Sequence, residues 1–181
     1  MPASPAAFVW YELVTTDMAA AEAFYRGVIG WRSQAWGEPG TAYTLMSAGE
    51  TTVAGLMPFP TEVRAAAGRP GWLGYIGVED VDAATNRVRQ AGAAVHRAPA
   101  DIPNIGRFSV VADPQGATFM LFTPQGGDRS PVPPMTPGHV GWHELYAADG
   151  PSAFDFYAGQ FGWTVGTKGM TISLEVQSLR A

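Results

Sequence analysis

Apolar residues along the chain recur at two spacings, which predict short strands alternating with helices. Runs rich in aromatic and β-branched residues fit half-buried strands, and we expect these at 8–14, 31–36, 42–46, 52–57, 72–78, 94–98, 108–112 and 118–123. One helix is expected before Gly30, with Ala20, Phe24 and Val28 on one apolar face, and another at 80–92. This order gives two consecutive β-α-β-β-β modules and an α+β fold class.

Local turn and capping signals support these boundaries. Thr16 or Asp17 can accept the free N–H groups of the first helix's opening turn, and Gly30 suits the left-handed residue that ends it. The segment 113–116, Asp-Pro-Gln-Gly, is a strong hairpin-turn sequence between the last two strands. We therefore expect that hairpin to close the second module.

One long segment occurs twice. The stretch Trp10 to Trp31 recurs at Trp142 to Trp163 without a gap, and ten of its 22 positions are identical. The identical residues of the second copy are Trp142, Glu144, Leu145, Asp149, Ala153, Phe156, Tyr157, Gly159, Gly162 and Trp163. A spaced repeat of this kind indicates a duplicated structural unit.

The repeat sets the expected domain organisation. Residues 1–124 are predicted to form one complete domain with modules at 8–57 and 72–123, followed by a Pro/Gly-rich linker at 125–137. Residues 138–181 read as an incomplete second copy, with a strand from His139, a helix, a strand near Trp163 and another at Met170 to Val176. Because an incomplete copy exposes apolar faces, we expect 138–165 to pack on the first domain or on a second subunit, the latter giving a homodimer.

Composition narrows the partners and the compartment. The net charge is −5 with no basic run, which argues against nucleic acid as a partner. The absence of cysteine excludes disulfides and thiolate metal sites. The N-terminal residues lack the pattern of a signal peptide, and no apolar run is long enough to span a bilayer. These features predict a cytoplasmic protein.

Three motifs resemble the vicinal oxygen chelate superfamily, which contains glyoxalase I, extradiol dioxygenases and bleomycin resistance proteins. They are ELVTTD…FYRGVIGW, GVEDVDAATNRVRQAG and DPQGATFMLF. The closer likeness is to tandem-domain glyoxalase-like proteins. The resemblance implies paired βαβββ modules that form a cupped mixed sheet, with a small-molecule site inside the cup.

The resemblance also implies a divalent metal, held by His or Gln on first strands and by Glu on a last strand. The matching positions here are taken as Trp10, Gly74 and Met120, and none of these side chains suits such a cation. We therefore predict no metal ligands and no cofactor. A divalent metal held through Glu12 stays as the alternative.

The predicted ligand-binding residues are those expected to point into the cup. They are Trp10, Glu12, Trp72, Ile76, Met120 and Phe122, with Arg107 and a rim loop at 101–106. Aromatic and Met side chains favour an apolar or aromatic ligand, and simple core packing is the competing interpretation. Glu12 is read as a paired structural carboxylate, as a ligand-binding group, or as a metal ligand or general base, and so as the one candidate catalytic residue.

Three functions are left open by the sequence. The first is a metal-free module that binds an apolar or aromatic small molecule, as resistance proteins of the resembled superfamily do. The second is a glyoxalase-like lyase or isomerase, or a dioxygenase, working around Glu12. The third is a truncated relative whose remaining role is assembly.

Overall fold

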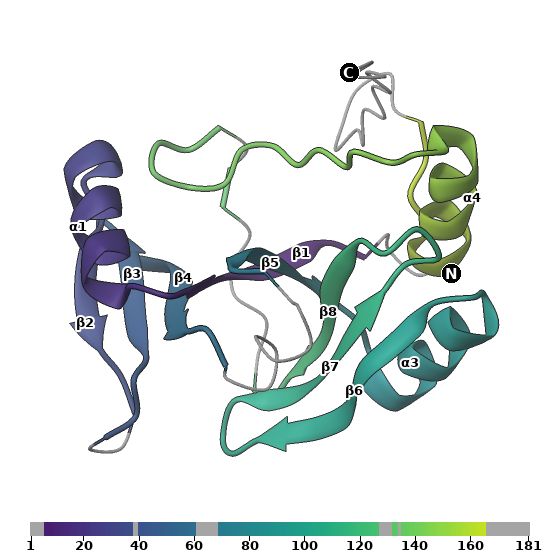
Figure 1. The fold of residues 1–181 in the computed structure, drawn as a ribbon, viewed down its shortest axis with the longest axis horizontal. Helices are drawn as coiled ribbons and strands as arrows, with labels where there is room; N and C mark the ends of the chain where they lie inside the picture. The colour runs from purple at the N-terminus through teal and green to yellow at the C-terminus, as the bar shows by residue number, and fades with distance from the viewer. Residues whose placement is uncertain (1–5, 38–39, 61–68, 127–131, 134, 166–181) are drawn as a thin grey trace. The chain divides into compact units, whose positions relative to one another are not determined.

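The computed structural model describes residues 6–37, 40–60, 69–126, 132–133 and 135–165. Within these ranges the strands are β1 (Phe8–Thr15), β2 (Arg32–Ala35), β3 (Thr44–Ala48), β4 (Thr51–Pro58), β5 (Gly71–Gly77), β6 (Ala94–Ile102), β7 (Gly106–Ala112) and β8 (Thr118–Pro124). The helices are α1 (Met18–Ile29), α3 (Val81–Gln90) and α4 (Gly150–Phe161) (Figure 1). None of these helices is long and apolar enough to cross a membrane.

The chain separates into two compact units that do not follow the chain order. Unit 1 takes its described residues from 1–9, 75–129 and 142–181, and unit 2 takes them from 10–74 and 130–141. The two copies of the repeat therefore divide at equivalent positions, Trp10 and Trp142. Each unit therefore contains one copy of the repeat together with the leading segment of the other copy, that is, the residues that directly precede it.

Equivalent indole hydrogen bonds fix those leading segments. In unit 2, Trp31 Nε1 donates to the carbonyl oxygen of Gly138 over 2.7 Å. In unit 1, Trp163 Nε1 donates to the carbonyl oxygen of Ala6 over 2.5 Å. Trp31 and Trp163 are equivalent positions of the repeat. Ala6 and Gly138 are separated by the same number of residues as the two tryptophans, so the two acceptors are equivalent as well.

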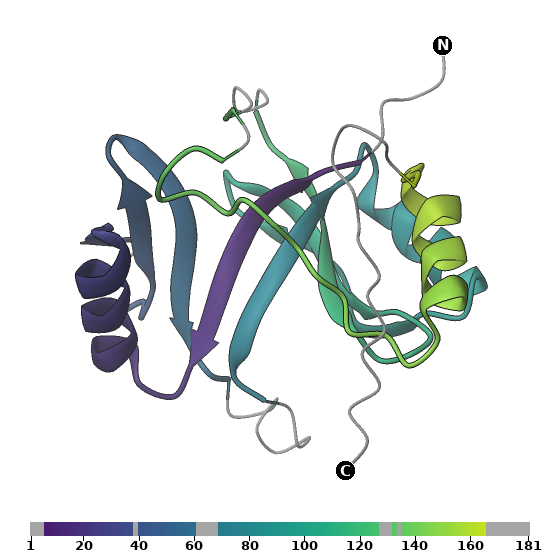
Figure 2. The same ribbon diagram turned by 90° about the horizontal axis from the view of Figure 1, so that it is seen from above.

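Unit 2 contains strands in the order β2-β3-β4-β1, with β1 parallel to β4 and the other pairs antiparallel. Helix α1 lies against β2 and β4 (Figure 2). The predicted caps are confirmed, since Asp17 accepts from the Ala20 N–H at 2.9 Å and Gly30 is left-handed at φ 80°. The core contains Leu13, Trp31, Met46, Val53, Ala54 and Leu56.

The apolar face predicted for α1, with Ala20, Phe24 and Val28, is not the face that the helix buries. Phe24 and Val28 are 57% and 67% exposed, whereas Met18, Ala21 and Tyr25 pack on the core. The helix is apolar around most of its circumference, so spacing alone did not decide which stripe meets the sheet. The result is an apolar surface on α1 that no described residue of unit 2 buries.

Unit 1 contains strands in the order β5-β8-β7-β6, with β5 parallel to β8 and the other pairs antiparallel. Helices α3 and α4 lie side by side over its core (Figures 1 and 2). The buried side chains of this core are Ile76, Val81, Ala84, Val88, Ala93, Val111, Phe119, Leu121, Phe156, Tyr157 and Phe161. With β1-α1-β2-β3-β4 and β5-α3-β6-β7-β8 in order, the predicted α+β fold of paired modules is confirmed.

The second copy forms its helix but not its strands. α4 lies where the repeat predicts a helix, and its N-cap Asp149 accepts from the Ser152 N–H at 3.1 Å. No residue of 139–147 or 162–165 belongs to a strand, so the strands predicted from His139 and near Trp163 are wrong. A strand needs a hydrogen-bonded neighbour, and no described strand pairs with these segments. The strand predicted at Met170 to Val176 lies outside the described residues.

Candidate functional site

In unit 1, helices cover one face of the sheet and leave the other face helix-free. The strand register shows which residues lie on each face. Tyr75 pairs with Met120, Ile76 with Leu121 and Gly77 with Phe122. Because alternate residues point to opposite faces, Ile76 and Leu121 lie beneath α3, where they join its core. Tyr75, Met120 and Phe122 lie on the opposite, helix-free face. Tyr75 and Phe122 meet edge to face, with ring centroids 5.9 Å apart.

The sequence-based register of β5 was therefore one residue out of phase. Ile76 lies on the helix-covered face, not with Met120 and Phe122. Trp72 has the same strand parity, and in unit 2 its indole Nε1 donates to the hydroxyl of Tyr25 on α1 over 2.7 Å. Neither side chain shares the helix-free face, although both were predicted to line the ligand site.

Arg107 also lies on the helix side. Its Nε and Nη2 atoms bond the carboxylate of Asp82 on α3 at 2.6 and 3.0 Å, and its Nη1 bonds Asp101 at 2.9 Å. The hydrogen bonds with Asp82 and Asp101 raise the pKa of Arg107, and the bond from Arg107 lowers the pKa of Asp82. The guanidinium is thus held in a fixed position at the end of β7.

A pocket of about 400 Å³ opens at that end of the sheet. It is lined by Asp101, Ile102, Pro103, Gly106, Arg107, Thr123, Pro124 and Gln125, so part of the predicted rim segment 101–106 lines it together with Arg107. Gly106 at φ 159° leaves no room for a side chain, because an added Cβ would lie 2.7 Å from the Phe122 ring. Gly106 thus connects the pocket lining to Phe122, a residue of the helix-free face. Pockets that bind small molecules are typically this size or larger, with a few fixed polar groups.

Glu12 is buried in unit 2, with 5% of its surface exposed. It pairs with Gly55 of β4, on the face of β1 that also bears Trp10 and that points away from Leu13 and the α1 core. Gly55 has no room for a Cβ because the Tyr43 hydroxyl occupies that space. Glu12 and the Tyr43 hydroxyl thus flank the same backbone position.

The residues that the resemblance assigns to a metal do not fit one. Within the described ranges, no group of three or more His, Cys, Asp or Glu side chains is placed to hold an ion. Trp10 and Met120 lack suitable donor atoms. Counting back from the N-cap Asp80 gives Leu73, rather than Gly74, as the first-strand position of the second module, and Leu73 has no donor either. We derive no step through a metal.

Two aromatic residues of these faces were not singled out from the sequence. Tyr75 lies beside Met120, but the apolar run of β5 gave no signal of which face it occupies. Tyr43 precedes β3 in a segment that shows no clear alternation. The pairing of Tyr75 with Met120 and the position of the Tyr43 hydroxyl against Gly55 identify them, and neither is visible in one sequence.

Comparisons with known proteins agree with this architecture. A family model of the Glyoxalase/Bleomycin resistance protein/Dioxygenase superfamily matches residues 7–121. The Mn(II)-bound glyoxalase of Novosphingobium aromaticivorans has a similar fold, with a TM-score of 0.59 and 19% identity over 89% of this chain and 53% of that one.

Two curated relatives are more similar in sequence. The anthracycline biosynthesis protein DnrV of Streptomyces peucetius is 33% identical over 93% of this chain and 66% of its own length. A putative glyoxylase, CFP32, of Mycobacterium bovis is 38% identical over 64% of this chain and 43% of its own length. The chain spans about two thirds of the length of the anthracycline biosynthesis relatives. From the family match and the paired modules, the chain belongs to the Glyoxalase/Bleomycin resistance protein/Dioxygenase superfamily.

Proposed function

We propose that this chain binds an apolar or aromatic small molecule, without the usual metal, at the end of β7 and β8. The observation that carries the proposal is the pocket of about 400 Å³ whose Gly106 wall lies directly on the Phe122 ring. Ile102 and Pro103 supply apolar walls, and the fixed guanidinium of Arg107 supplies a donor at the rim. Such a site accepts a flat apolar body with few polar substituents.

The curated relatives support an aromatic ligand. Two of them are named as anthracycline biosynthesis proteins, and anthracyclines are polycyclic aromatic molecules. The Phe122 ring lies next to Gly106 of the pocket wall, which places an aromatic side chain beside the site. We therefore take an anthracycline as the first ligand to test.

Titration with doxorubicin after dialysis against EDTA tests this proposal. Ile102, the last residue of β6, lines the pocket, and Ile105, in the turn that follows, does not, so the two alanine variants form a matched pair. We expect Ile102→Ala to raise the Kd roughly tenfold, since it removes apolar contact, and Ile105→Ala to change it less than about twofold. Binding that needs added Mn²⁺ or Zn²⁺, or that ignores Ile102→Ala, contradicts the proposal.

A second candidate is a glyoxalase-like lyase or isomerase with Glu12 as its base. It is favoured by the burial of Glu12 and by the Tyr43 hydroxyl over the neighbouring Gly55, a pair of groups that could exchange a proton with a substrate. The relative named as a putative glyoxylase points to the same chemistry. In this case turnover of the methylglyoxal–glutathione hemithioacetal is expected, and Glu12→Gln reduces kcat at least a hundredfold. A Glu12→Gln variant with unchanged kcat removes this candidate.

A further inference from the structure

Strand β6 departs from regular alternation on both sides of Arg97. Its register against β7 shifts between Val95 and Arg97, and again between Arg97 and Ala100. In an unbroken strand, Arg97 would share the face of Val95, two residues earlier, which packs against the helix-covered core. Arg97 instead pairs with Val110, whose partner on β8 is Met120 of the helix-free face. The two shifts therefore turn the Arg97 side chain to the helix-free face.

An aromatic ring holds the Arg97 side chain on that face. Its guanidinium carbon lies 4.8 Å from the centroid of the Phe108 ring. Phe108 is buried, with 7% of its surface exposed, whereas Arg97 is exposed. The face of an aromatic ring attracts a cation, but the guanidinium keeps its charge and its N–H donors. Register shifts that re-aim a side chain in this way are frequent next to binding sites.

The charge of Arg97 differs from that of Arg107, which also belongs to this end of the sheet. Asp82 and Asp101 both bond the guanidinium of Arg107, so its positive charge is already balanced. Among the residues that the structure describes, no carboxylate pairs with Arg97. Arg97 therefore keeps a charge that the carboxylate of a ligand can balance.

Arg97 lies close to the pocket at the end of β7 and β8. Ile102 pairs with Gly106, and both line the pocket. The next pair on that face is Ala100 with Phe108, the residue whose ring lies beneath Arg97. Successive pairs on one face are two residues apart, a distance of roughly 7 Å along a strand. A fused aromatic ring system spans this distance, so one ligand can reach both the pocket and Arg97.

We infer that Arg97 is the anion-binding residue of the candidate site, and that the ligand is a flat aromatic molecule bearing a carboxylate. The ring system lies in the pocket, and the carboxylate accepts hydrogen bonds from the Arg97 guanidinium. Phe108 is a positioning residue, because it holds Arg97 in place. This inference rests on the proposed function and adds an acid group to the class of ligand.

A matched pair of probes separates the effect of charge from that of shape. Anthraquinone-2-carboxylate and anthraquinone-2-carboxamide share a ring system, and only the first is anionic at neutral pH. By isothermal titration calorimetry at low salt, we expect the full-length protein to bind the carboxylate about tenfold more tightly than the amide. Raising NaCl from about 0.05 M to about 0.5 M should reduce this ratio, because Arg97 is exposed.

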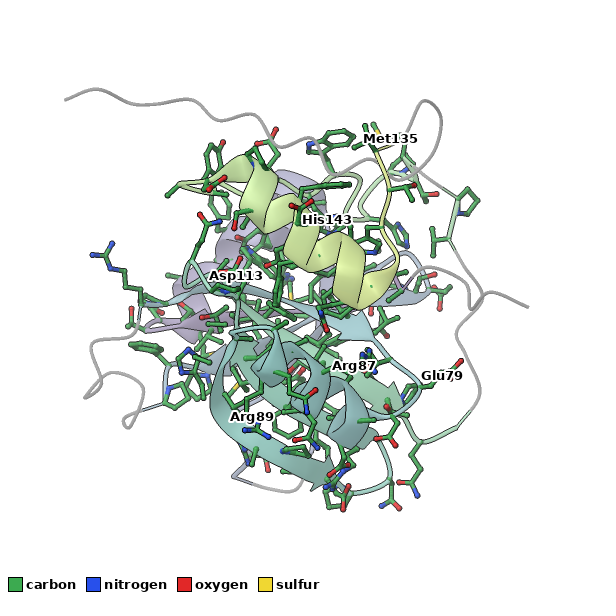
Figure 3. All side chains as sticks on the ribbon, turned by 90° about the vertical axis from the view of Figure 1, so that its right-hand side faces the viewer. Glu79, Arg87, Arg89, Asp113, Met135 and His143 are labelled. Atoms are coloured by element: carbon green, nitrogen blue, oxygen red, sulfur yellow. The ribbon has the colours of Figure 1, made fainter. Side chains whose placement is uncertain are left out.

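Substitutions then locate the two parts of the ligand. Arg97→Gln should lower the ratio to less than about twofold without changing the Kd of the amide, and Arg97→Lys should keep part of the preference. Arg87→Gln makes the same change of net charge on α3, where Figure 3 shows Arg87, and should keep the full ratio. Ile102→Ala should weaken both probes equally, because it removes a pocket contact that they share.

The outcomes separate this inference from the proposed function. Equal binding of the two probes, a ratio that salt does not reduce, or a carboxylate preference that Arg97→Gln retains overturns the inference alone. A carboxylate whose Kd ignores Ile102→Ala binds outside the pocket and overturns it too. Loss of the circular dichroism signal in Arg97→Gln would show that Arg97 supports the sheet, again against the inference. Failure of both probes to bind overturns the proposed function and this inference together.

Discussion

The two copies of the repeat differ most where they depend on the rest of the chain. α1 and α4 share an Asp N-cap and a left-handed Gly C-cap, and both form twelve-residue helices. Before the helix, however, one copy forms β1 paired with β4, whereas the other forms no strand at 142–147. Capping is local, so the sequence carries it from copy to copy, while strand formation and burial require partners elsewhere.

Truncating the equivalent phenylalanines should give the largest difference between the copies. Phe156→Ala removes a side chain that is 8% exposed and should lower the free energy of unfolding by about 3–5 kcal/mol. Phe24→Ala removes one that lies largely in water and should change it by less than about 0.5 kcal/mol. Urea unfolding followed by circular dichroism measures both. Equal losses would show that α1 and α4 are similarly packed in solution.

The next largest difference is expected between two aspartates whose carboxylates accept hydrogen bonds from backbone N–H groups. Asp113 accepts from the N–H groups of Gln115 and Ala117 at 2.9 Å each, and from the Tyr157 hydroxyl. Asp113→Ala should therefore cost about 2–3 kcal/mol of unfolding free energy, because these donors lose a buried acceptor. Asp17→Ala removes only a helix cap and should cost about 1 kcal/mol, which makes it the matched control. Thermal unfolding that ranks the two variants the other way is the contrary outcome.

Alkaline pH should loosen α4 through Tyr157. Burial, followed by the charge of Asp113 and the hydrogen bond to it, raises the pKa of Tyr157 above its ordinary value. The folded chain therefore keeps the phenol proton more tightly than the unfolded chain. The stabilisation that this proton contributes is fully present below a pH of about 10, the ordinary pKa of tyrosine. It declines as the pH rises above that unfolded pKa.

Tyr157→Phe should reduce that alkaline decline in unfolding free energy, as measured by urea titrations between pH 8 and 11. Some slope should persist, since burial also raises the pKa of Tyr11 to about 12. A profile that Tyr157→Phe does not alter would assign the alkaline loss to other groups.

The smallest effect is expected on the exposed side of α1. Arg26 pairs with Glu22 one turn earlier at 3.3 Å, and its repeat equivalent in α4 is Ala158. Arg26→Ala should change the unfolding free energy by only about 0.3 kcal/mol. A loss above about 1 kcal/mol, measured in the same urea assay, would mean that this face of α1 is already covered in solution.

The parts that sequence predicted correctly are those governed by local chemistry. The Asp17 and Gly30 caps and the Asp113 turn depend on a few adjacent residues, and each formed as expected. The face of β5 could not be predicted because Gly71–Gly77 has apolar residues on both faces, so alternation gives no phase. The ion pairs of Arg107 could not be predicted for a related reason, because its acidic partner Asp82 is brought near only by the packing of α3.

In the candidate site, too, features set by residue type could be predicted, and features set by strand pairing could not. The aromatic character of the helix-free face followed from residue types, as the positions of Met120 and Phe122 show. The loop predicted at 101–106 is shorter in the structure, because β6 extends to Ile102 and β7 begins at Gly106. Tyr43 beside Gly55 depends on how β3 and β4 pair, which one sequence does not report. Glu12 on β1 was found by strand parity, yet its chemical role stays a prediction.

The two indole hydrogen bonds determine what happens when the chain is cut within the linker. Trp31 donates to Gly138 and Trp163 donates to Ala6. A cut between residues 126 and 132 would therefore leave two fragments that still bind each other through both hydrogen bonds. Such a nick should yield a non-covalent complex that survives gel filtration, rather than two independent folding halves. The linker is therefore a natural place to split the chain for complementation, with reassembly reported by the two tryptophans themselves.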